Sequence, residues 1–433
     1  CVKACLEKAR EKGMEAWIYD ENGWPSGFVG GLLLKNENYL ARFLEYSVGD
    51  FDKTAFAAYI ADDEKGFVRV ESSVNGVKEY HNVYLKISPA NTDILNPEVT
   101  DAFIRETHEK YYARFKEYFG KELVGFFTDE PQYYRWATPY TPVAEKEFEK
   151  DGENIKDGLI WLFIKDERGY AFREKYYKTL NALYVENFYK KIYEWCGEHN
   201  CKLTGHTIEE STLGMQMYGG AAVMPCYEYE DIPAVDWLGR FCGSELEVKQ
   251  VASVAAQLGK KRIMTETFAC SGYDVTPKEL KSIAEFQYFG GVNMTCQHLY
   301  PYSVAGRGRI DHPPVFGPHG NWNEGFKAFN DYFARLSYII TNTEEKPEIG
   351  VIHPISDIWL DYIRSEDEKS VRETEERFNE FMTVLRNNGV SYHFIDERIL
   401  SRHGKVENGV LKVGKSVYNT VIVPKMRNIA SSV

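Results

Sequence analysis

Apolar segments that end in acidic or aromatic residues alternate with helical segments along most of this chain, and this alternation constrains the fold more than any other feature. Strands separated by helices build βαβ units, whose strands are parallel and apolar because both faces of the sheet are covered. We expect seven such strands, at 14–21, 83–88, 123–130, 201–207, 234–239, 262–268 and 292–300. Helical spacing of apolar residues predicts helices at 2–13, 98–118, 171–198, 244–258, 277–289 and 324–341.

Seven strands with polar residues at their C-terminal ends predict a (β/α)8 TIM barrel, because that fold builds its active site at this end of its strands. The chain opens on a helix, so we expect the barrel's first strand to precede residue 1 and to be missing from this chain. An open doubly wound sheet is the alternative. The regular recurrence of acid-tipped strands favours the barrel.

Two regions depart from the barrel pattern. Residues 51–82 show strand-like alternation interrupted by Gly66 and Asn75-Gly76, which predicts a small β insertion. After Lys346-Pro347 a buried strand (348–359), a charged helix (369–388) and two further strands (390–396 and 417–425) follow. We therefore expect a barrel domain over 1–345 and a partial flavodoxin-like α/β domain over 346–433.

Several predicted strands end on carboxylates or imidazoles: Asp20 and Glu21, Asp129 and Glu130, His206 with Glu209 and Glu210, Glu266, and His298. A single acid at such a position often accepts hydrogen bonds from the next helix N-terminus or pairs with a nearby cation. In a barrel all of these groups converge on one mouth, and their number indicates a functional site rather than capping alone.

Aromatic residues make up 15% of the chain, and four of them crowd behind the paired acids Asp129-Glu130 at Tyr133, Tyr134, Trp136 and Tyr140. An aromatic-rich core explains part of this content. Paired carboxylates ringed by aromatic side chains also suit cleavage of a glycosidic bond. One acid must stay protonated to donate to the leaving oxygen, and the other must stay ionised. Glu130 lies where the general acid belongs.

This hypothesis predicts which residues contact the sugar. The expected sugar-contacting aromatic residues are Trp24, Tyr133, Trp136, Trp237, Tyr300 and Tyr302, of which Trp237 is the one best explained by packing alone. The expected polar contacts are Asp20, Glu21, Asp129, His206, Glu210 and His298.

No sequence motif predicts a metal or cofactor with certainty. HxH and HExxH spacings are absent from the sequence, so we expect His206 and His298 to form hydrogen bonds rather than to bind zinc. An acid-rich mouth can bind Ca²⁺ through oxygen ligands, and calcium stays open as a cofactor. The GRGR stretch at 306–309 reads as a loop, in which Arg307 and Arg309 either meet substrate hydroxyls or are simply solvated.

Charge and cysteine usage narrow the class of partner. The formal net charge is −13, which argues against nucleic acid or an anionic membrane as partner. No apolar run reaches the roughly 18 residues that indicate a membrane span. The eight cysteines form no CxxC pair, which favours a reducing, cytoplasmic compartment. Carbohydrate is the expected partner.

Several segments together resemble glycoside hydrolase family 106, the α-L-rhamnosidases and their barrel relatives. The similar segments are WIYDENGWPSGFVGG (17–31), FFTDEP (126–131), GHTIEES (205–211), TETFA (265–269), GVNMTCQHLYPYS (291–303), RIDHPP (309–314) and FARLSYI (333–339). The resemblance spans roughly residues 1–345 and implies an inverting α-L-rhamnosidase-like enzyme, with calcium dependence, acting on a plant or host glycan. A flavodoxin-like domain often trails such barrels.

Carried onto this chain, the resemblance implies Glu130 as general acid and Glu266 as general base. Counting strands separately places Glu130 on the fourth strand and Glu266 on the seventh. Carboxylates on these two strands lie close enough in many barrels for a retaining mechanism, which stays an alternative. Glu209 and Glu210 also compete for the second role, but Glu266 lies within a strand, and rigid elements hold catalytic groups best. A barrel that binds carbohydrate without cleaving it is the alternative function.

Overall fold

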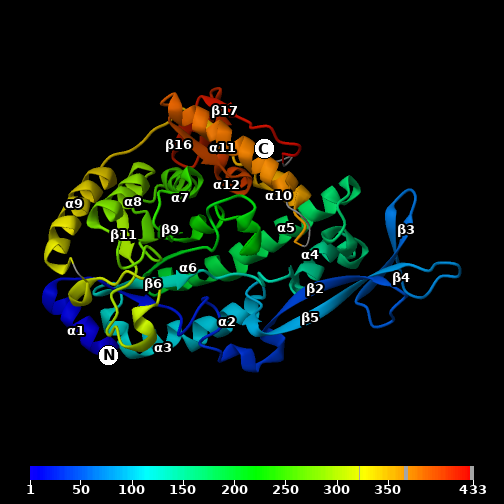
Figure 1. The fold of residues 1–433 in the computed structure, drawn as a ribbon, viewed down its shortest axis with the longest axis horizontal. Helices are drawn as coiled ribbons and strands as arrows, with labels where there is room; N and C mark the ends of the chain where they lie inside the picture. Colours follow the sequence, from blue (N-terminus) through cyan, green and yellow to red (C-terminus); the bar gives the residue numbers. More distant parts are fainter. Residues whose placement is uncertain (321, 365–368, 430–433) are drawn as a thin grey trace.

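The computed structural model describes residues 1–320, 322–364 and 369–429 and centres on one parallel sheet (Figure 1). Its six strands lie in the order β1-β6-β8-β9-β10-β11, and the sheet curls into about half a barrel with β1 and β11 at its edges. The strands are β1 (Ala16–Tyr19), β6 (Leu123–Asp129), β8 (Lys202–His206), β9 (Ile232–Trp237), β10 (Met264–Thr267) and β11 (Met294–Gln297).

Six of the seven predicted parallel strands are therefore confirmed, and the seventh is wrong. Residues 83–88 belong instead to β5 (Tyr80–Thr92), which pairs in antiparallel fashion with β2 (Leu40–Gly49). In the observed sheet Glu130 follows the second strand and Glu266 lies on the fifth, so the predicted separation of three strands is kept. A closed eight-stranded barrel is not seen within residues 1–320.

Helices flank the sheet, and local signals explain where several of them begin and end. The helix predicted at 277–289 is confirmed as α8 (Pro277–Phe289). Thr276 and Glu279 form a reciprocal capping box at its start, and Pro277 occupies its first turn. The other helices before residue 345 are α1 (Val2–Lys12), α2 (Pro97–Glu106), α3 (His108–Phe115), α4 (Pro142–Lys150), α5 (Tyr170–Tyr184), α6 (Lys190–Glu198), α7 (Glu245–Leu258) and α9 (Asn323–Thr341).

Two predicted helices differ in detail from the structure. The helix predicted at 98–118 is divided at Thr107 into α2 and α3. The helix predicted at 171–198 runs through, but a π-helical turn at Val185–Tyr189 joins α5 to α6. Fully buried tyrosines along this long helix, including Tyr176, Tyr177 and Tyr184, show that much of the aromatic content packs the core.

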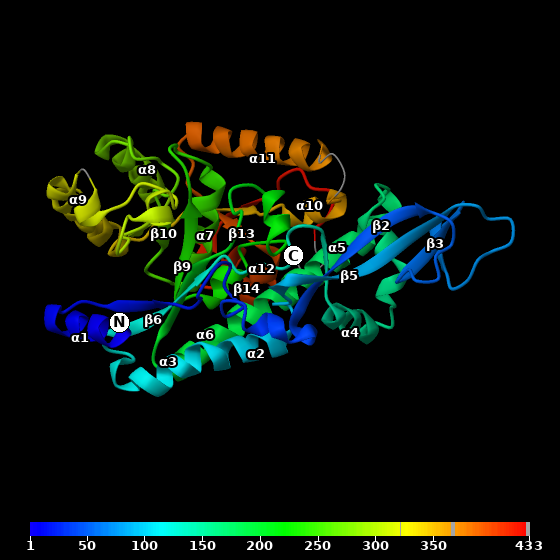
Figure 2. The ribbon, with the colours of Figure 1, turned by 60° about the horizontal axis from the view of Figure 1, so that its bottom comes forward.

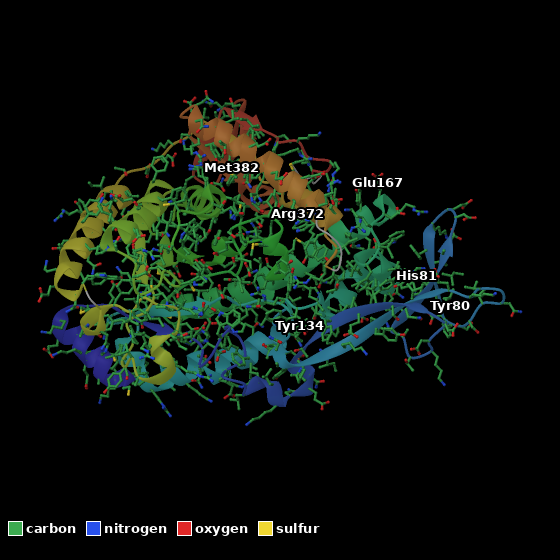
Figure 3. The ribbon with its side chains drawn as sticks, viewed as in Figure 1. Tyr80, His81, Tyr134, Glu167, Arg372 and Met382 are labelled. Carbon is green, nitrogen blue, oxygen red and sulfur yellow. The ribbon has the colours of Figure 1, made fainter. Side chains whose placement is uncertain are left out.

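The β insertion is larger than predicted. A five-stranded antiparallel sheet in the order β4-β3-β5-β2-β7 extends as an arm from the body (Figure 2). Besides β2 and β5 it contains β3 (Ala57–Asp62), β4 (Gly66–Val70) and β7 (Thr138–Tyr140). The strands thus begin before residue 51 and end after residue 82. Within the arm, Tyr46 donates to Nδ1 of His81, marked in Figure 3, or accepts from it, at 2.7 Å.

The C-terminal region forms a second, smaller α/β unit, as the sequence predicts. Its parallel strands lie in the order β13-β12-β17, and a separate antiparallel sheet has the order β14-β15-β16. A complete flavodoxin-like sheet is not seen within 346–364 and 369–429. The elements are β12 (Ile349–Ile352), α10 (Ile355–Asp361), α11 (Lys369–Asn387), β13 (Tyr392–Ile395), α12 (Glu397–His403), β14 (Gly404–Glu407), β15 (Val410–Val413), β16 (Ser416–Tyr418) and β17 (Thr420–Ile422).

Buried hydrogen bonds join this unit to the half-barrel. Gln257 on α7 donates to the carbonyl of Phe394 at 2.8 Å and to the hydroxyl of Tyr418 at 2.9 Å. The amide of Phe394 in turn donates to Oγ of Ser253 at 2.9 Å. The domain boundary at 345/346 stays a prediction, and the two units pack directly on one another.

The inner, concave face of the curled sheet has its own small apolar cluster. Phe127, Ile232, Ala234 and Met264 pack together there, with Trp17 and Met294 beside them. Side chains alternate between the two faces of a strand, so residues two positions further along each strand point to the same inner face. No helix in the described part of the chain is long and apolar enough to cross a membrane.

Candidate active site

Four adjacent strands each place a titratable side chain on the inner face at their C-terminal ends. Asp129 lies two residues after Phe127 on β6, Asp236 two after Ala234 on β9, and Glu266 two after Met264 on β10. The register pairs Asp129 with His206 of β8 and Glu266 with Asp236. Parallel strands therefore bring three carboxylates and one imidazole together at one edge of the sheet.

His206 is the centre of this group. Its Nε2 atom lies 3.1 Å from Oε2 of Glu266 and 3.6 Å from Oδ1 of Asp129. Burial by itself lowers the pKa of an imidazole, but the hydrogen bond with Glu266 and the charges of Asp236, Glu266 and Asp129 outweigh burial. The pKa of His206 is consequently raised well above its usual range. His206 is a buried cation among acids.

Glu266 has the opposite proton preference. Burial favours its neutral form, but the hydrogen bond and charge of His206, with further help from His298 and His312, lower the pKa of Glu266 below its usual value. Its carboxylate thus stays ionised at neutral pH while the strand on which it lies fixes its direction.

Glu130 follows directly after β6 in a left-handed conformation, with φ of 45°. Its amide donates to the carbonyl of His206 at 3.2 Å, and the indole of Trp24 donates to its Oε2 at 2.7 Å. Burial raises the pKa of Glu130, and the charge of Asp129 adds to the rise, against the opposing effects of His206 and Trp24. Glu130 therefore holds its proton to higher pH than Glu266 does.

Sequence reasoning missed two residues of this group. Asp236 lies with Glu130 and His206 in a set whose ligand atoms are all within 4.8 Å of one another, and burial raises its pKa well above the usual range. The hydroxyl of Tyr19 on β1 donates to Oδ2 of Asp129 at 2.5 Å. Both residues end strands as the predicted ones do, so strand position is the signal that identifies them.

The loop after β1 is held in place by the two acids that precede it. The carboxylate of Glu21 accepts the backbone N–H groups of Phe28, Val29 and Gly30 at 2.9, 2.8 and 2.6 Å. The hydroxyl of Ser26 donates to Asp20 at 2.6 Å. Asp20 is buried, and Glu21 is occupied by the backbone. The structure thus places both behind the site, where they shape the loop that carries Trp24.

The backbone of Ser26 also ties this loop to β6. Its amide donates to the carbonyl of Asp129 at 2.8 Å, and its hydroxyl accepts the amide of Asp129 at 2.8 Å. These two bonds fix the loop against the strand end that carries the paired acids.

The six predicted sugar-contacting aromatic residues divide into two sets. Trp24, Trp136, Tyr300 and Tyr302 are exposed, whereas Tyr133 and Trp237 are each 3% exposed and lie in the core. Tyr133 bonds the carbonyl of Met217, and Trp237 donates to the carbonyl of Phe241 at 3.0 Å. Packing thus accounts for Tyr133 and Trp237.

The aromatic crowd after Glu130 has a structural explanation as well. Tyr134, marked in Figure 3, stacks on Phe43 of β2 with ring centroids 4.6 Å apart. Tyr140 belongs to β7, which pairs with β2. This segment therefore joins the active-site edge of the half-barrel to the β arm.

Glu210 and Glu209 lie differently from one another. Glu210 is buried and accepts from the amide of Thr207 and the amide of Asp236, both at 3.0 Å, and burial raises its pKa to about 7. It braces the ends of β8 and β9 from behind. Glu209 pairs with Arg135 at 2.6 Å.

His298, just past β11, faces the other side of Glu266. Its Nε2 lies 3.7 Å from Oε1 of Glu266, and its ring stacks on His312 at a centroid distance of 5.7 Å. Burial lowers the pKa of His298 despite the nearby charge of Glu266. A neutral imidazole in this position can both donate to and accept from hydroxyl groups.

Two sets of three residues have the geometry to share a cation, namely Asp129, His206 and Glu266, and Glu130, His206 and Asp236. Each set offers two carboxylates and an imidazole nitrogen. Calcium takes about six to eight oxygen ligands, so neither set alone provides its usual shell. Calcium therefore stays an expectation from the resemblance, and the mechanism below uses only the side chains of the chain.

Comparison with known proteins adds structural relatives alone. The sequence matches no protein-family model and no curated protein. A rhamnosidase from Novosphingobium sp. PP1Y superposes with a TM-score of 0.61 at 15% identity, over 85% of this chain and 36% of that one. A GH42 β-galactosidase from G. stearothermophilus gives 0.56 at 8% identity, over 98% and 59%.

A further β-galactosidase, from Bacillus circulans sp. alkalophilus, gives a TM-score of 0.54 at 11% identity, over 98% of this chain and 59% of that one. This chain thus spans between about a third and three fifths of the length of these enzymes. At such low identity the likeness concerns the fold. The chain shares the half-barrel architecture and its attached α/β unit with a fold found in glycoside hydrolases.

Proposed function

We propose that this chain is the catalytic region of a glycoside hydrolase, α-L-rhamnosidase-like, that acts on a plant or host glycan by inversion. The observation that carries the proposal is the opposite proton preference of Glu130 and Glu266 around one imidazole, with the pKa of Glu130 raised and that of Glu266 lowered. Glycosidic cleavage needs one carboxyl group of each kind. The rhamnosidase among the structural neighbours and the similar sequence segments support the sugar class.

In the proposed reaction, Glu130 gives its proton to the glycosidic oxygen as the bond from that oxygen to the anomeric carbon breaks. Glu266 takes a proton from a water molecule whose oxygen attacks the anomeric carbon from the opposite face. His206 keeps Glu266 ionised before the attack. Proton exchange with solvent afterwards restores protonated Glu130 and ionised Glu266.

The surroundings fit a sugar ring. Exposed Trp24 bonds to Glu130, so an apolar face lies beside the acid that meets the leaving group. Carbohydrate C–H surfaces pack on such faces. His298 and Tyr19 lie beside the carboxylates and offer hydrogen-bonding groups to hydroxyls. The β-galactosidases among the neighbours make β-galactosides the second substrate class to test.

The test is hydrolysis of a panel of aryl glycosides that includes α-L-rhamnosides and β-galactosides. We expect release of the aryl group from the α-L-rhamnoside, and the first product seen by NMR should have the inverted anomeric configuration. Glu130→Gln and Glu266→Gln should each lower turnover by about 10²–10⁴-fold or more. Glu149→Gln, an exposed glutamate on α4, is the control.

Good leaving groups separate the two roles. Glu130→Gln should keep much of its rate on an aryl glycoside whose phenol is acidic, because that phenol needs no proton, whereas Glu266→Gln should not. Retained configuration would show that Glu266 attacks the sugar directly. Sugar binding without hydrolysis of any aryl glycoside would establish the carbohydrate-binding alternative instead.

A further inference from the structure

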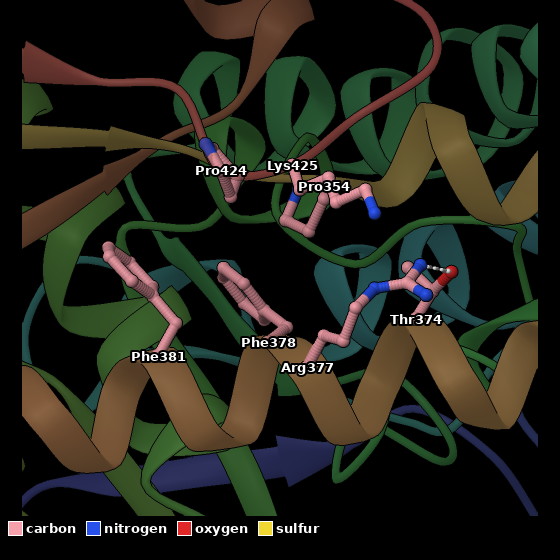
Figure 4. Close-up of a pocket in the computed structure, with 7 residues that line it drawn as sticks. All are labelled: Pro354, Thr374, Arg377, Phe378, Phe381, Pro424 and Lys425. Atoms are coloured by element: carbon pink, nitrogen blue, oxygen red, sulfur yellow. Dashed lines mark hydrogen bonds between the residues drawn. The ribbon is translucent and has the colours of Figure 1, made fainter.

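A cavity of about 200 Å³ lies in the second α/β unit, apart from the carboxylates described above (Figure 4). Pro354 follows the C-terminal end of β12 by two residues, and Pro424 and Lys425 follow the end of β17. These strands are parallel neighbours, with Ile349 paired to Thr420. The cavity therefore opens at the carboxyl ends of two adjacent parallel strands, and α11 covers it.

The strand order at this point is the one at which open α/β sheets bind ligands. In the order β13-β12-β17 the middle strand is the first in sequence, and the chain crosses from one side of it to the other. Loops after the two strands at such a switch point leave in opposite directions and open a crevice between them. The cavity lies in that crevice.

Two cations of the cavity lining have no acidic partner. Arg377 on α11 donates to Oγ1 of Thr374 at 2.9 Å, and neither Arg377 nor Lys425 forms an ion pair with any residue of 1–320, 322–364 or 369–429. Figure 4 shows both charged ends pointing toward the same end of the cavity. Thr374 itself is only 4% exposed, so its hydroxyl is a fixed, buried group beside the cations.

The other end of the cavity is apolar. Phe378 and Phe381 rise together from α11, with ring planes 22° apart and centroids separated by 6.2 Å. Pro354 and Pro424 lie on the opposite side of the cavity from these rings (Figure 4). The site thus offers a flat apolar surface next to a positively charged end.

We propose that this cavity binds a small organic anion with a flat ring, either a carboxylate or a phosphate ester. The guanidinium and ammonium groups receive the anionic group, because charge-assisted hydrogen bonds to such oxygens are the strong ones. The ring packs between the phenylalanines and the prolines. The volume equals that of about seven water molecules, which limits the ligand to one ring and its acidic substituent. This site is independent of the proposed hydrolase chemistry.

The test is titration calorimetry on the whole chain with phenyl phosphate, benzoate, phenol and inorganic phosphate as probes. We expect phenyl phosphate or benzoate to bind with one-to-one stoichiometry, and phenol and inorganic phosphate to bind at least about tenfold more weakly, since each lacks one half of the ligand. Preference between phenyl phosphate and benzoate identifies the acidic group.

Variants localise the binding. Arg377→Gln and Lys425→Gln should each weaken the better probe by about tenfold. Both side chains are exposed at their charged ends, so these changes leave the fold intact, which circular dichroism checks. Arg386→Gln, on the same helix outside the cavity, should leave binding unchanged. Absence of binding in the millimolar range, or binding that is indifferent to both variants, would overturn the proposal.

Discussion

The Nε2 atom of His206 lies 3.1 Å from Oε2 of Glu266, and this contact sets the charge of both groups. The imidazole is a buried cation because of the acids around it, and the carboxylate stays ionised because of the imidazole. Glu130, beyond the next strand, escapes this influence enough for burial to raise its pKa. One histidine thereby separates the proton preferences of two glutamates.

Replacing His206 by Gln should move the acidic limb of the pH–rate profile. Activity requires ionised Glu266, so the rate is present above the pKa of Glu266 and is lost as pH falls through it. Without the cation the pKa of Glu266 rises, so the loss should begin at higher pH. We also expect turnover to fall by roughly 10²-fold. The measurement is kcat/KM against pH.

His403→Gln serves as the control, because His403 pairs with Glu228 far along the chain from the strand ends. An acidic limb that stays in place in His206→Gln would contradict this role of the histidine.

Replacing Trp24 by Phe should move the basic limb instead. The indole N–H stabilises the carboxylate form of Glu130 through the 2.7 Å bond, so its loss raises the pKa of Glu130 further. Activity requires protonated Glu130, so the rate is present below that pKa and should persist to higher pH in the variant. Trp136→Phe is the matched control, since this indole is 64% exposed and has no such bond. Equal shifts in both variants would disprove the link.

Replacing Glu21 by Gln should loosen the loop that carries Trp24. A carboxylate can accept all of its backbone N–H partners at residues 27–30, whereas an amide has a single acceptor oxygen. We expect a stability loss of about 1–3 kcal/mol and faster hydrogen exchange at these amides. Glu15→Gln, at an exposed position, is the control. Unchanged exchange at residues 27–30 would show that the loop is held by other contacts.

Replacing His353 by Phe should alter the pH dependence of stability. His353 is 1% exposed, and burial lowers its pKa to about 3. Unfolding frees the imidazole to bind a proton, so its contribution to stability is complete above about pH 6.5 and is lost as pH falls toward the folded value. The phenyl ring does not titrate.

Urea unfolding at several pH values measures this effect. Between pH 7.5 and 5.5 the wild type should lose about 1.4 kcal/mol relative to His353→Phe. The exposed His319, replaced in the same way, supplies the control. A constant difference between wild type and His353→Phe over this range would mean that His353 is protonated in the folded chain.

Local sequence signals determined the elements whose causes are themselves local. The capping box and proline that start α8, the left-handed Gly13 that ends α1, and the apolar runs of β6, β8 and β10 are all written within a few residues. The positions of Glu130, His206 and Glu266 at strand ends follow from the same runs. Their convergence follows once the strands are taken as parallel neighbours.

Only the tertiary structure decided which strands pair and what each polar side chain contacts. An apolar run such as 83–88 is equally suited to a parallel or an antiparallel neighbour, and contacts with β2 place it in the arm. Asp20, Glu21 and Glu210 look like mouth residues in sequence, but burial and backbone hydrogen bonds place them behind the site. Such contacts join residues far apart in the chain. Strand periodicity states that a side chain alternates in direction, and packing selects the face that meets solvent.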